Sequence, residues 1–386
     1  MDIHSLFAQR KYVCLDYHDV SVLSKAQKET IVEAMSNILY IFLKSIGYSH
    51  EVPEKDSCLR EALWSWARTE LARATSRDID SLGILLEESI SSAESFYPLA
   101  SQEVRLMMAK ATALAISLDS NYLSPEAKYK LSNSQNRFWQ GLEPEDVWSP
   151  VFFNFLRECA GLFGANDPLL GTLVTSGWSR WLDGCLLEEQ LWEMAQKIGD
   201  GDGQALDANF CPIEDFPYYL RTLTGAPMSY CVPAFKPSRD VEVPYSVWMS
   251  YAPALTTVIN LGNDLFSYPK EVLDGEKVNY VSLVTHIKRT SGCRSRFAEG
   301  SLWTFRDTIC DLFERVLRNC EVLGQAFKTP RQCNEAEEIP RHCSSSSESN
   351  LAGSFCHGFI HGYLGWHVNS PRYRLDSLKA RLASDA

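Results

Sequence analysis

Asn263, Ser267 and Glu271 follow one another at four-residue steps in the chain. On an α-helix this spacing places three side chains on one face, with about 6 Å of rise between neighbours. An amide oxygen, a hydroxyl and a carboxylate are hard donors that suit Mg²⁺, which takes a few protein oxygens together with waters and substrate phosphates. The spacing therefore predicts a Mg²⁺ site and, with it, a substrate that is a phosphate ester.

Polar residues four apart also occur on any solvated helix face, so the surrounding sequence decides between the two interpretations. Residues 247–261, which come just before the motif, are mostly apolar. We therefore expect the helix to lie inside the protein and to carry its ligands into a cavity. Pro269 lies between Ser267 and Glu271 and removes one backbone hydrogen bond, so we expect a kink there.

Three segments, in the correct order, resemble the fungal trichodiene synthase family of class I terpene synthases. Residues 263–271 match that family's second metal-binding motif. Residues 219–225 match the segment in which an arginine, here Arg221, senses the diphosphate. Residues 361–367, followed by 371–375, resemble the C-terminal signature of the family. The resemblance covers roughly the C-terminal half of the chain, and the N-terminal half fits only loosely.

The resemblance implies a fold, a cofactor and a set of site residues. The fold would be all-α, with residues 1–386 forming a single bundle of helices around a central apolar cavity. Three Mg²⁺ ions would hold the diphosphate, bound on one side by Asn263, Ser267 and Glu271. The implied diphosphate-binding residues are Arg221, Lys270, Arg372 and Tyr373, and the implied cavity residues are Tyr363 and Trp366.

The chain departs from the family at the Asp-rich motif that normally holds the other metal ions. An apolar helix over residues 111–118 ends in Asp119, and only this residue remains where related enzymes carry two or three acidic residues. We predict that Asp119 is a metal ligand; the alternative is a carboxylate that only ends the helix. The number of ligands on this side of the metal cluster stays open.

The implied residue types suit the chemistry of diphosphate loss. A guanidinium offers a planar fork to phosphate oxygens, whereas an ammonium acts as a point charge. Aromatic ring faces stabilise a carbocation, and excluding water protects it. Aromatic residues at helical spacing more often form an ordinary core, so only Tyr363 and Trp366 are predicted as cavity residues, and Phe96 and Trp303 remain without a motif.

Composition limits the class of protein. The 386 residues are 45% hydrophobic and 22% charged, which is typical of a globular chain. A net charge of −12 argues against nucleic acid and anionic membrane surfaces as partners. No apolar run reaches membrane-spanning length, no signal peptide is recognisable, and no two of the twelve cysteines form a C-x-x-C pair. We expect a cytoplasmic protein with free thiols.

The hydrophobic spacing is helical throughout, with amphipathic helices expected over residues 26–46, 58–74 and 103–118. Two polar stretches interrupt this pattern. Residues 199–203 alternate Gly and Asp, but no Glu follows at the position that a calcium loop needs, so we interpret them as a surface connection. Residues 329–350 are rich in serine and are expected to form a disordered loop within the domain.

These observations favour a sesquiterpene synthase that ionises and cyclises farnesyl diphosphate. One alternative is a prenyltransferase that elongates or couples isoprenoids, although such enzymes carry two full Asp-rich motifs. Another is a non-catalytic isoprenoid-binding relative. Humulene, caryophyllene, longiborneol-like and trichodiene-like products all remain open, because small changes of cavity contour redirect a cation. The family also implies a homodimer.

Overall fold

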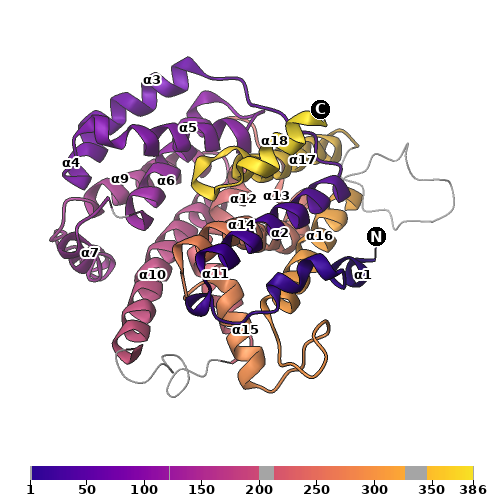
Figure 1. The fold of residues 1–386 in the computed structure, drawn as a ribbon. Helices are drawn as coiled ribbons and strands as arrows, with labels where there is room; N and C mark the ends of the chain where they lie inside the picture. Colours follow the sequence, from indigo (N-terminus) through magenta and orange to yellow (C-terminus); the bar gives the residue numbers. More distant parts are fainter. Residues whose placement is uncertain (1, 121, 200–212, 327–345, 386) are drawn as a thin grey trace.

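The computed structural model describes residues 2–120, 122–199, 213–326 and 346–385 (Figure 1). These parts of the chain are helical and contain no strand; one isolated bridge pairs Arg294 with Leu302. The all-α prediction is therefore confirmed. The α-helices are α1 (Ile3–Phe7), α2 (Lys25–Ser45), α3 (Ser57–Trp66), α4 (Ala72–Thr75), α5 (Gly83–Phe96), α6 (Gln102–Asp119), α7 (Pro125–Leu131), α8 (Ser134–Trp139), α9 (Ser149–Phe163), α10 (Pro168–Gly199), α11 (Phe216–Thr224), α12 (Pro227–Phe235), α13 (Tyr245–Trp248), α14 (Ala252–Asp274), α15 (Tyr280–Thr290), α16 (Phe305–Ala326), α17 (Ser346–Asn369) and α18 (Asp376–Ser384).

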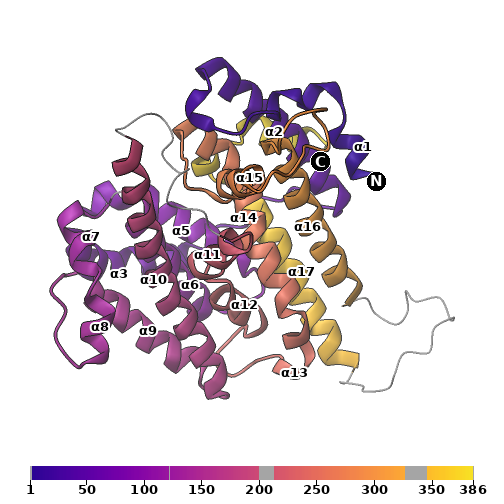
Figure 2. The same cartoon turned by 90° about the horizontal axis from the view of Figure 1, so that it is seen from below.

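The helix α14 lies at the centre of the bundle and packs against α2, α12, α16 and α17. Figure 2 shows it between α10 on one side and α16 with α17 on the other. The apolar sequence before the metal motif explains this position, because Leu255, Val258 and Leu261 are all buried. The helix ends at Gly275, whose φ of 74° is the left-handed conformation that glycine adopts without strain. The prediction that this helix lies inside the protein is confirmed.

The local sequence explains where the helices begin and end. A capping box formed by Ser24 and Gln27 starts α2, and its face of Ile31, Met35 and Ile38 is fully buried. The helix expected over residues 58–74 is interrupted: α3 gives way to a π-helical turn at Ala67–Leu71 before α4. In α14 the helix continues through Pro269 without ending.

The two polar stretches have different outcomes. Residues 200–203 and 329–345 lie outside the described residues. Residues 346–350 do not form the expected loop but the first turn of α17. Glu348 in that turn favours a helix start, because a carboxylate stabilises the positive end of the helix dipole.

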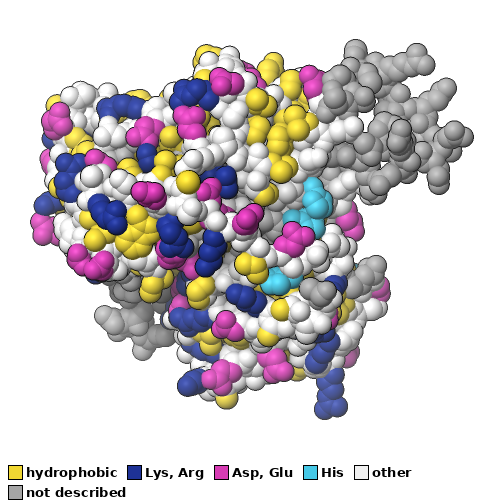
Figure 3. Space-filling model, turned by 90° about the horizontal axis from the view of Figure 1, so that it is seen from above, with side chains coloured by type: hydrophobic (Ala, Val, Ile, Leu, Met, Phe, Trp, Pro, Cys, Tyr) yellow, Lys and Arg dark blue, Asp and Glu magenta, His cyan; other side chains and the backbone are white. Residues whose placement is uncertain are grey.

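On the face drawn in Figure 3, acidic and basic side chains are intermingled over the surface. Among the described helices, none is both long and apolar enough to cross a membrane.

Candidate active site

A cavity of about 260 Å³ opens between α6, α10, α11, α14 and the end of α17. Every site residue predicted from the sequence lines it, although the residues come from four helices and the turn after α17. These residues are Asp119, Arg221, Asn263, Ser267, Lys270, Glu271, Tyr363, Trp366, Arg372 and Tyr373. The structure thus brings the predicted set together, and the role of each residue stays a prediction.

The lining changes from apolar to charged along each of three helices. On α6 it runs from Ala115 and Ile116 to Asp119 at the last residue. On α10 it runs from Trp178 and Trp181 to Glu188, and on α14 from Ile259 through the metal motif to Glu271. The cavity therefore has a charged end, formed toward the C-termini of these helices, and an apolar end.

The metal motif lies on one face of α14, as predicted. Ser267 Oγ donates a hydrogen bond to Glu271 Oε1 over 2.5 Å, across the turn that contains Pro269. Burial raises the pKa of Glu271 to about 8, and the neighbouring carboxylates of Asp264 and Glu276 add to the effect. A bound divalent cation would favour the ionised form, so this carboxyl group suits a metal site.

Arg221 lies beside the metal motif. Its Nη2 donates to Asn263 Oδ1 over 2.9 Å, and its Nε lies 3.0 Å from Asp264 Oδ1. Its Nη1 donates to Thr224 Oγ1 over 2.9 Å. Burial alone would lower the pKa of the Arg221 guanidinium, but the carboxylates of Asp264 and Glu188 outweigh it and hold the pKa above its ordinary value. The guanidinium therefore remains charged inside the cavity.

The C-terminal signature closes the charged end from the other side. Arg372 Nη2 forms an ion pair with Asp119 Oδ2, and Arg372 Nη1 donates to Ser120 Oγ over 2.6 Å. Burial would raise the pKa of Asp119, but Arg372 and Lys270 outweigh it and lower that pKa. Lys270 Nζ in turn donates to Glu276 Oε1 over 3.0 Å. Asp119 is therefore both the last residue of α6 and an ionised carboxylate facing the cavity.

His367 is a cavity residue that the sequence analysis quoted but did not select. Burial lowers its pKa to about 4, so the imidazole is neutral. Its Nδ1 lies 2.7 Å from the Tyr363 carbonyl oxygen, which requires Nδ1 to carry the proton, and its Nε2 lies 3.1 Å from Asn263 Nδ2. Asn263 Nδ2 also donates to Tyr373 Oη over 3.3 Å. These contacts fix the amide with its oxygen toward Arg221.

Three carboxyl groups of the cavity were not among the residues predicted from the sequence: those of Glu188, Asp264 and Glu276. Burial raises the pKa of Glu188 to about 7 and that of Asp264 to about 6. With Asp119 and Glu271, the cavity holds five carboxyl groups against three cationic side chains, those of Arg221, Lys270 and Arg372. Within the described part of the chain, Glu188 makes no hydrogen bond or ion pair. Its helical spacing from Trp178 and Trp181 is the signal that could have identified it.

Aromatic rings form the apolar end. The Phe96 ring lies 5.0 Å from that of Tyr363 and 5.4 Å from that of Trp366, measured between centroids. Trp178 packs against Trp181 at 5.6 Å and Tyr230 at 5.3 Å. Phe96, which no motif identified, is thus a cavity residue. Trp303 is not; its Nε1 donates to Thr308 outside the cavity.

The break between α11 and α12 lies against the cavity and has a tight geometry. A Cβ on Gly225 would lie 2.0 Å from Asn260 Oδ1 and 2.9 Å from the Arg221 carbonyl oxygen, so any other residue would force these neighbours to shift. The next residue, Ala226, has a φ of 42°, in the left-handed region that residues with a Cβ rarely adopt. The helix α11 ends at Thr224, and the close approach of Asn260 explains why a glycine follows it.

Comparison with known proteins relates the chain to terpene synthases, although no protein-family model matches it. It is 22% identical over 348 residues to an (E)-beta farnesene synthase of Metarhizium brunneum, which covers 89% of each chain. It is 23% identical over 281 residues to terpene synthase BipA of Cochliobolus sativus, which covers 72% of this chain and 71% of that protein.

Two solved bacterial structures share the fold. Germacradien-4-ol synthase from Streptomyces citricolor superposes with a TM-score of 0.53 and 15% identity, over 83% of this chain and 96% of that one. Linalool/nerolidol synthase from Streptomyces clavuligerus, in complex with 2-fluorogeranyl diphosphate, superposes with a TM-score of 0.51 and 17% identity. The superposition covers 84% of this chain and 98% of that one. The chain is thus similar in sequence to terpene synthases of fungi, and it shares the all-α fold of two bacterial terpene synthases.

Proposed function

We propose that the protein is a Mg²⁺-dependent sesquiterpene synthase that ionises farnesyl diphosphate and cyclises the resulting allylic cation. The observation that carries the proposal is the polarity of the cavity. Oxygen donors and cationic side chains gather at one end, and Phe96, Trp178, Tyr363 and Trp366 line the other. A substrate with a diphosphate head and a hydrocarbon tail matches this arrangement.

The residues at the charged end fit divalent cations. Asn263, Ser267 and Glu271 would hold one ion, and Asp119 with Glu188 would hold ions on the opposite side. An excess of carboxyl groups over cationic side chains favours this occupancy, and so does the absence of any hydrogen bond or ion pair from Glu188 to the described residues. When bound, Mg²⁺ would neutralise the charge of the departing diphosphate.

Cationic and hydroxyl groups of the chain would bind and orient the diphosphate. Arg221 offers its guanidinium fork, Arg372 does the same from the C-terminal turn, and Lys270 adds a point charge. Tyr373 Oη, which accepts a bond from Asn263 Nδ2, keeps its hydroxyl proton for a phosphate oxygen, because burial raises the Tyr373 pKa well above its usual value. These groups must leave their present partners when the diphosphate arrives.

The apolar end would shelter and shape the cation. The ring faces of Phe96, Tyr363 and Trp366 attract positive charge, and the packed aromatic wall keeps water away from it. The (E)-beta farnesene synthase that covers 89% of this chain supports a fifteen-carbon substrate.

We also propose that the whole chain, 1–386, forms one domain and assembles as a homodimer. Light scattering of the purified protein tests the assembly.

The proposal is tested by incubating the purified protein with geranyl, farnesyl or geranylgeranyl diphosphate and Mg²⁺, followed by gas chromatography and mass spectrometry of the volatiles. We expect sesquiterpenes from farnesyl diphosphate and no turnover by Glu271→Gln, which removes the carboxylate but keeps the shape. Asp274→Asn, on the same helix but paired with Arg374 outside the cavity, is the matched control. In a parallel incubation with added isopentenyl diphosphate, longer prenyl alcohols after phosphatase treatment would indicate a prenyltransferase. No product in either incubation would contradict catalysis.

A further inference from the structure

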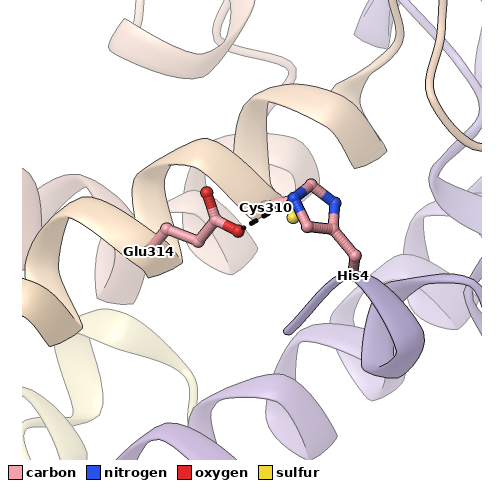
Figure 4. A group of neighbouring side chains, drawn as sticks. All are labelled: His4, Cys310 and Glu314. Atoms are coloured by element: carbon pink, nitrogen blue, oxygen red, sulfur yellow. Dashed lines mark ion pairs between the residues drawn. The ribbon is translucent and has the colours of Figure 1, made fainter. Parts of the chain in front are cut away.

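Three side chains with metal-binding donor atoms lie together outside the active-site cavity. His4 comes from α1, and Cys310 and Glu314 lie one turn apart on α16 (Figure 4). Their donor atoms all lie within 4.8 Å of one another, and His4 Nε2 is 3.3 Å from Glu314 Oε1. None of these three residues lines the cavity, so the group is separate from the proposed Mg²⁺ site.

The position of His4 is set by packing that does not involve the other two side chains. Phe7, one turn further along α1, is fully buried, and its ring lies 5.8 Å from that of Phe313 on α16. The buried Arg306 of α16 donates from Nε to the Phe7 carbonyl oxygen over 2.8 Å and from Nη2 to that of Gln9 over 3.2 Å. The fold therefore holds α1 against α16 and presents His4 to Cys310 and Glu314 before any ion binds.

The donor set selects the kind of ion. An imidazole nitrogen, a thiolate sulfur and a carboxylate oxygen suit Zn²⁺ and related transition metals, whereas Mg²⁺ and Ca²⁺ prefer oxygen alone. With metal–ligand bonds of about 2.0–2.3 Å, tetrahedral geometry separates neighbouring donors by about 3.3–3.6 Å. The distance of 3.3 Å between His4 Nε2 and Glu314 Oε1 already matches this separation of neighbouring donors. Three protein ligands leave the fourth position to water.

The surrounding charges also favour a cation. The carboxylates of Glu314, Asp311 and Asp307 act on Cys310, and Arg296 is the cationic group that acts on it. Arg296 is already paired with both aspartates, at 2.8 Å from Asp311 and 3.6 Å from Asp307. Burial raises the pKa of the Cys310 thiol to about 12, so the thiol is protonated without metal. Binding would release this proton to the solvent.

We propose that His4, Cys310 and Glu314 form a binding site for Zn²⁺, or for a transition metal ion of the same ligand preference, which fastens α1 to α16. The ion bonds to the neutral imidazole, the deprotonated sulfur and the carboxylate. This site does not depend on the proposed terpene synthase activity.

The full-length protein is titrated with Co²⁺ as a spectroscopic probe, with excess Mg²⁺ present to occupy sites made of oxygen ligands. We expect one equivalent to bind with a thiolate-to-cobalt charge-transfer band that Zn²⁺ abolishes. Cys310→Ser should remove the band, and His4→Gln should weaken binding by at least about tenfold. Cys293→Ser and His357→Gln, which change a thiol and an exposed imidazole outside the cluster, should leave the titration unchanged.

Absence of the band in the wild-type protein would overturn the proposal, and so would a band that survives Cys310→Ser. Because Cys310 is buried, the serine variant is first checked for its melting temperature. If it does not fold, His4→Gln at its exposed position provides the test: unchanged Co²⁺ affinity in that variant would overturn the proposal and leave only a polar contact between His4 and Glu314.

Discussion

Arg221 Nη2 donates a hydrogen bond to Asn263 Oδ1 over 2.9 Å, so a group expected to bind diphosphate occupies an oxygen expected to bind metal. The same kind of pairing joins Arg372 to Asp119. The two arginines are thus paired with the side-chain oxygens that are expected to bind metal. A metal ion that binds Asn263 or Asp119 displaces the paired arginine, which is then free to bind diphosphate. Diphosphate that binds the arginine frees the oxygen for metal in the same way, so the two binding events are coupled.

The coupling can be measured without turnover. Calorimetric titration of Mn²⁺ should show binding at least about tenfold tighter in the presence of inorganic diphosphate than in its absence, because each ligand frees the groups that the other needs. The Arg221→Gln variant should lose most of this difference. Equal Mn²⁺ affinity with and without diphosphate would show that the pairs do not oppose binding.

Glu188 and Glu189 are adjacent on α10 and provide a matched pair of variants. Glu188 lines the cavity, whereas Glu189 forms an ion pair with Lys128 at 3.4 Å. Glu188→Gln should raise the Mg²⁺ concentration required for half-maximal activity by about tenfold or more, because it removes a ligand opposite the Asn263 helix. Glu189→Gln should behave like the wild type. If both variants have the same Mg²⁺ requirement, Glu188 is not a ligand.

The raised pKa values predict how metal affinity depends on pH. Burial raises the pKa of Glu271 to about 8, of Glu188 to about 7 and of Asp264 to about 6. Below these values the groups hold protons, which a metal ion must displace. Affinity for Mn²⁺ in the presence of diphosphate should therefore rise as the pH increases from 6 to 8 and level off above. Affinity that is constant or falls over this range would contradict the assignment of Glu271 and Glu188 as ligands.

The helix break beside the cavity should tolerate no side chain at Gly225. Gly225→Ala would place its Cβ against Asn260 Oδ1, and we expect a loss of stability of about 1–3 kcal/mol by denaturant unfolding. Gly324→Ala is the control: it lies in α16 with no atom within 4 Å of the added Cβ, and it should stabilise the protein by roughly 0.5–1 kcal/mol. A stable Gly225→Ala variant would show that the break adjusts easily.

The sequence predicted best what a single helix determines. The common face of Asn263, Ser267 and Glu271 follows from helical spacing alone, and the structure reproduces it. Arg221 comes before this helix in the chain and Arg372 comes after it. Only the family resemblance indicated that both lie beside it. Whether the chain is nearer to trichodiene synthases than to other fungal terpene synthases stays a prediction.

The missed residues depend on how the helices pack. Glu188 looks like any surface carboxylate on a helix until the packing of α10 places it in the cavity. His367 was indistinguishable from a core histidine, because its contact with Asn263 joins two helices. Phe96 ends α5, in the N-terminal half of the chain that fits the family only loosely. These residues are brought to the site by tertiary structure, which the local sequence pattern does not encode.

The most direct test of the proposed activity is the release of inorganic diphosphate from farnesyl diphosphate, followed with a coupled assay alongside the quantity of terpene formed. We expect one diphosphate released for each terpene formed and complete dependence of both on Mg²⁺. In Asn263→Ala, the rates of both should fall by at least about a hundredfold. Release of diphosphate that proceeds without Mg²⁺, or no release by the wild-type protein, would contradict the proposed activity.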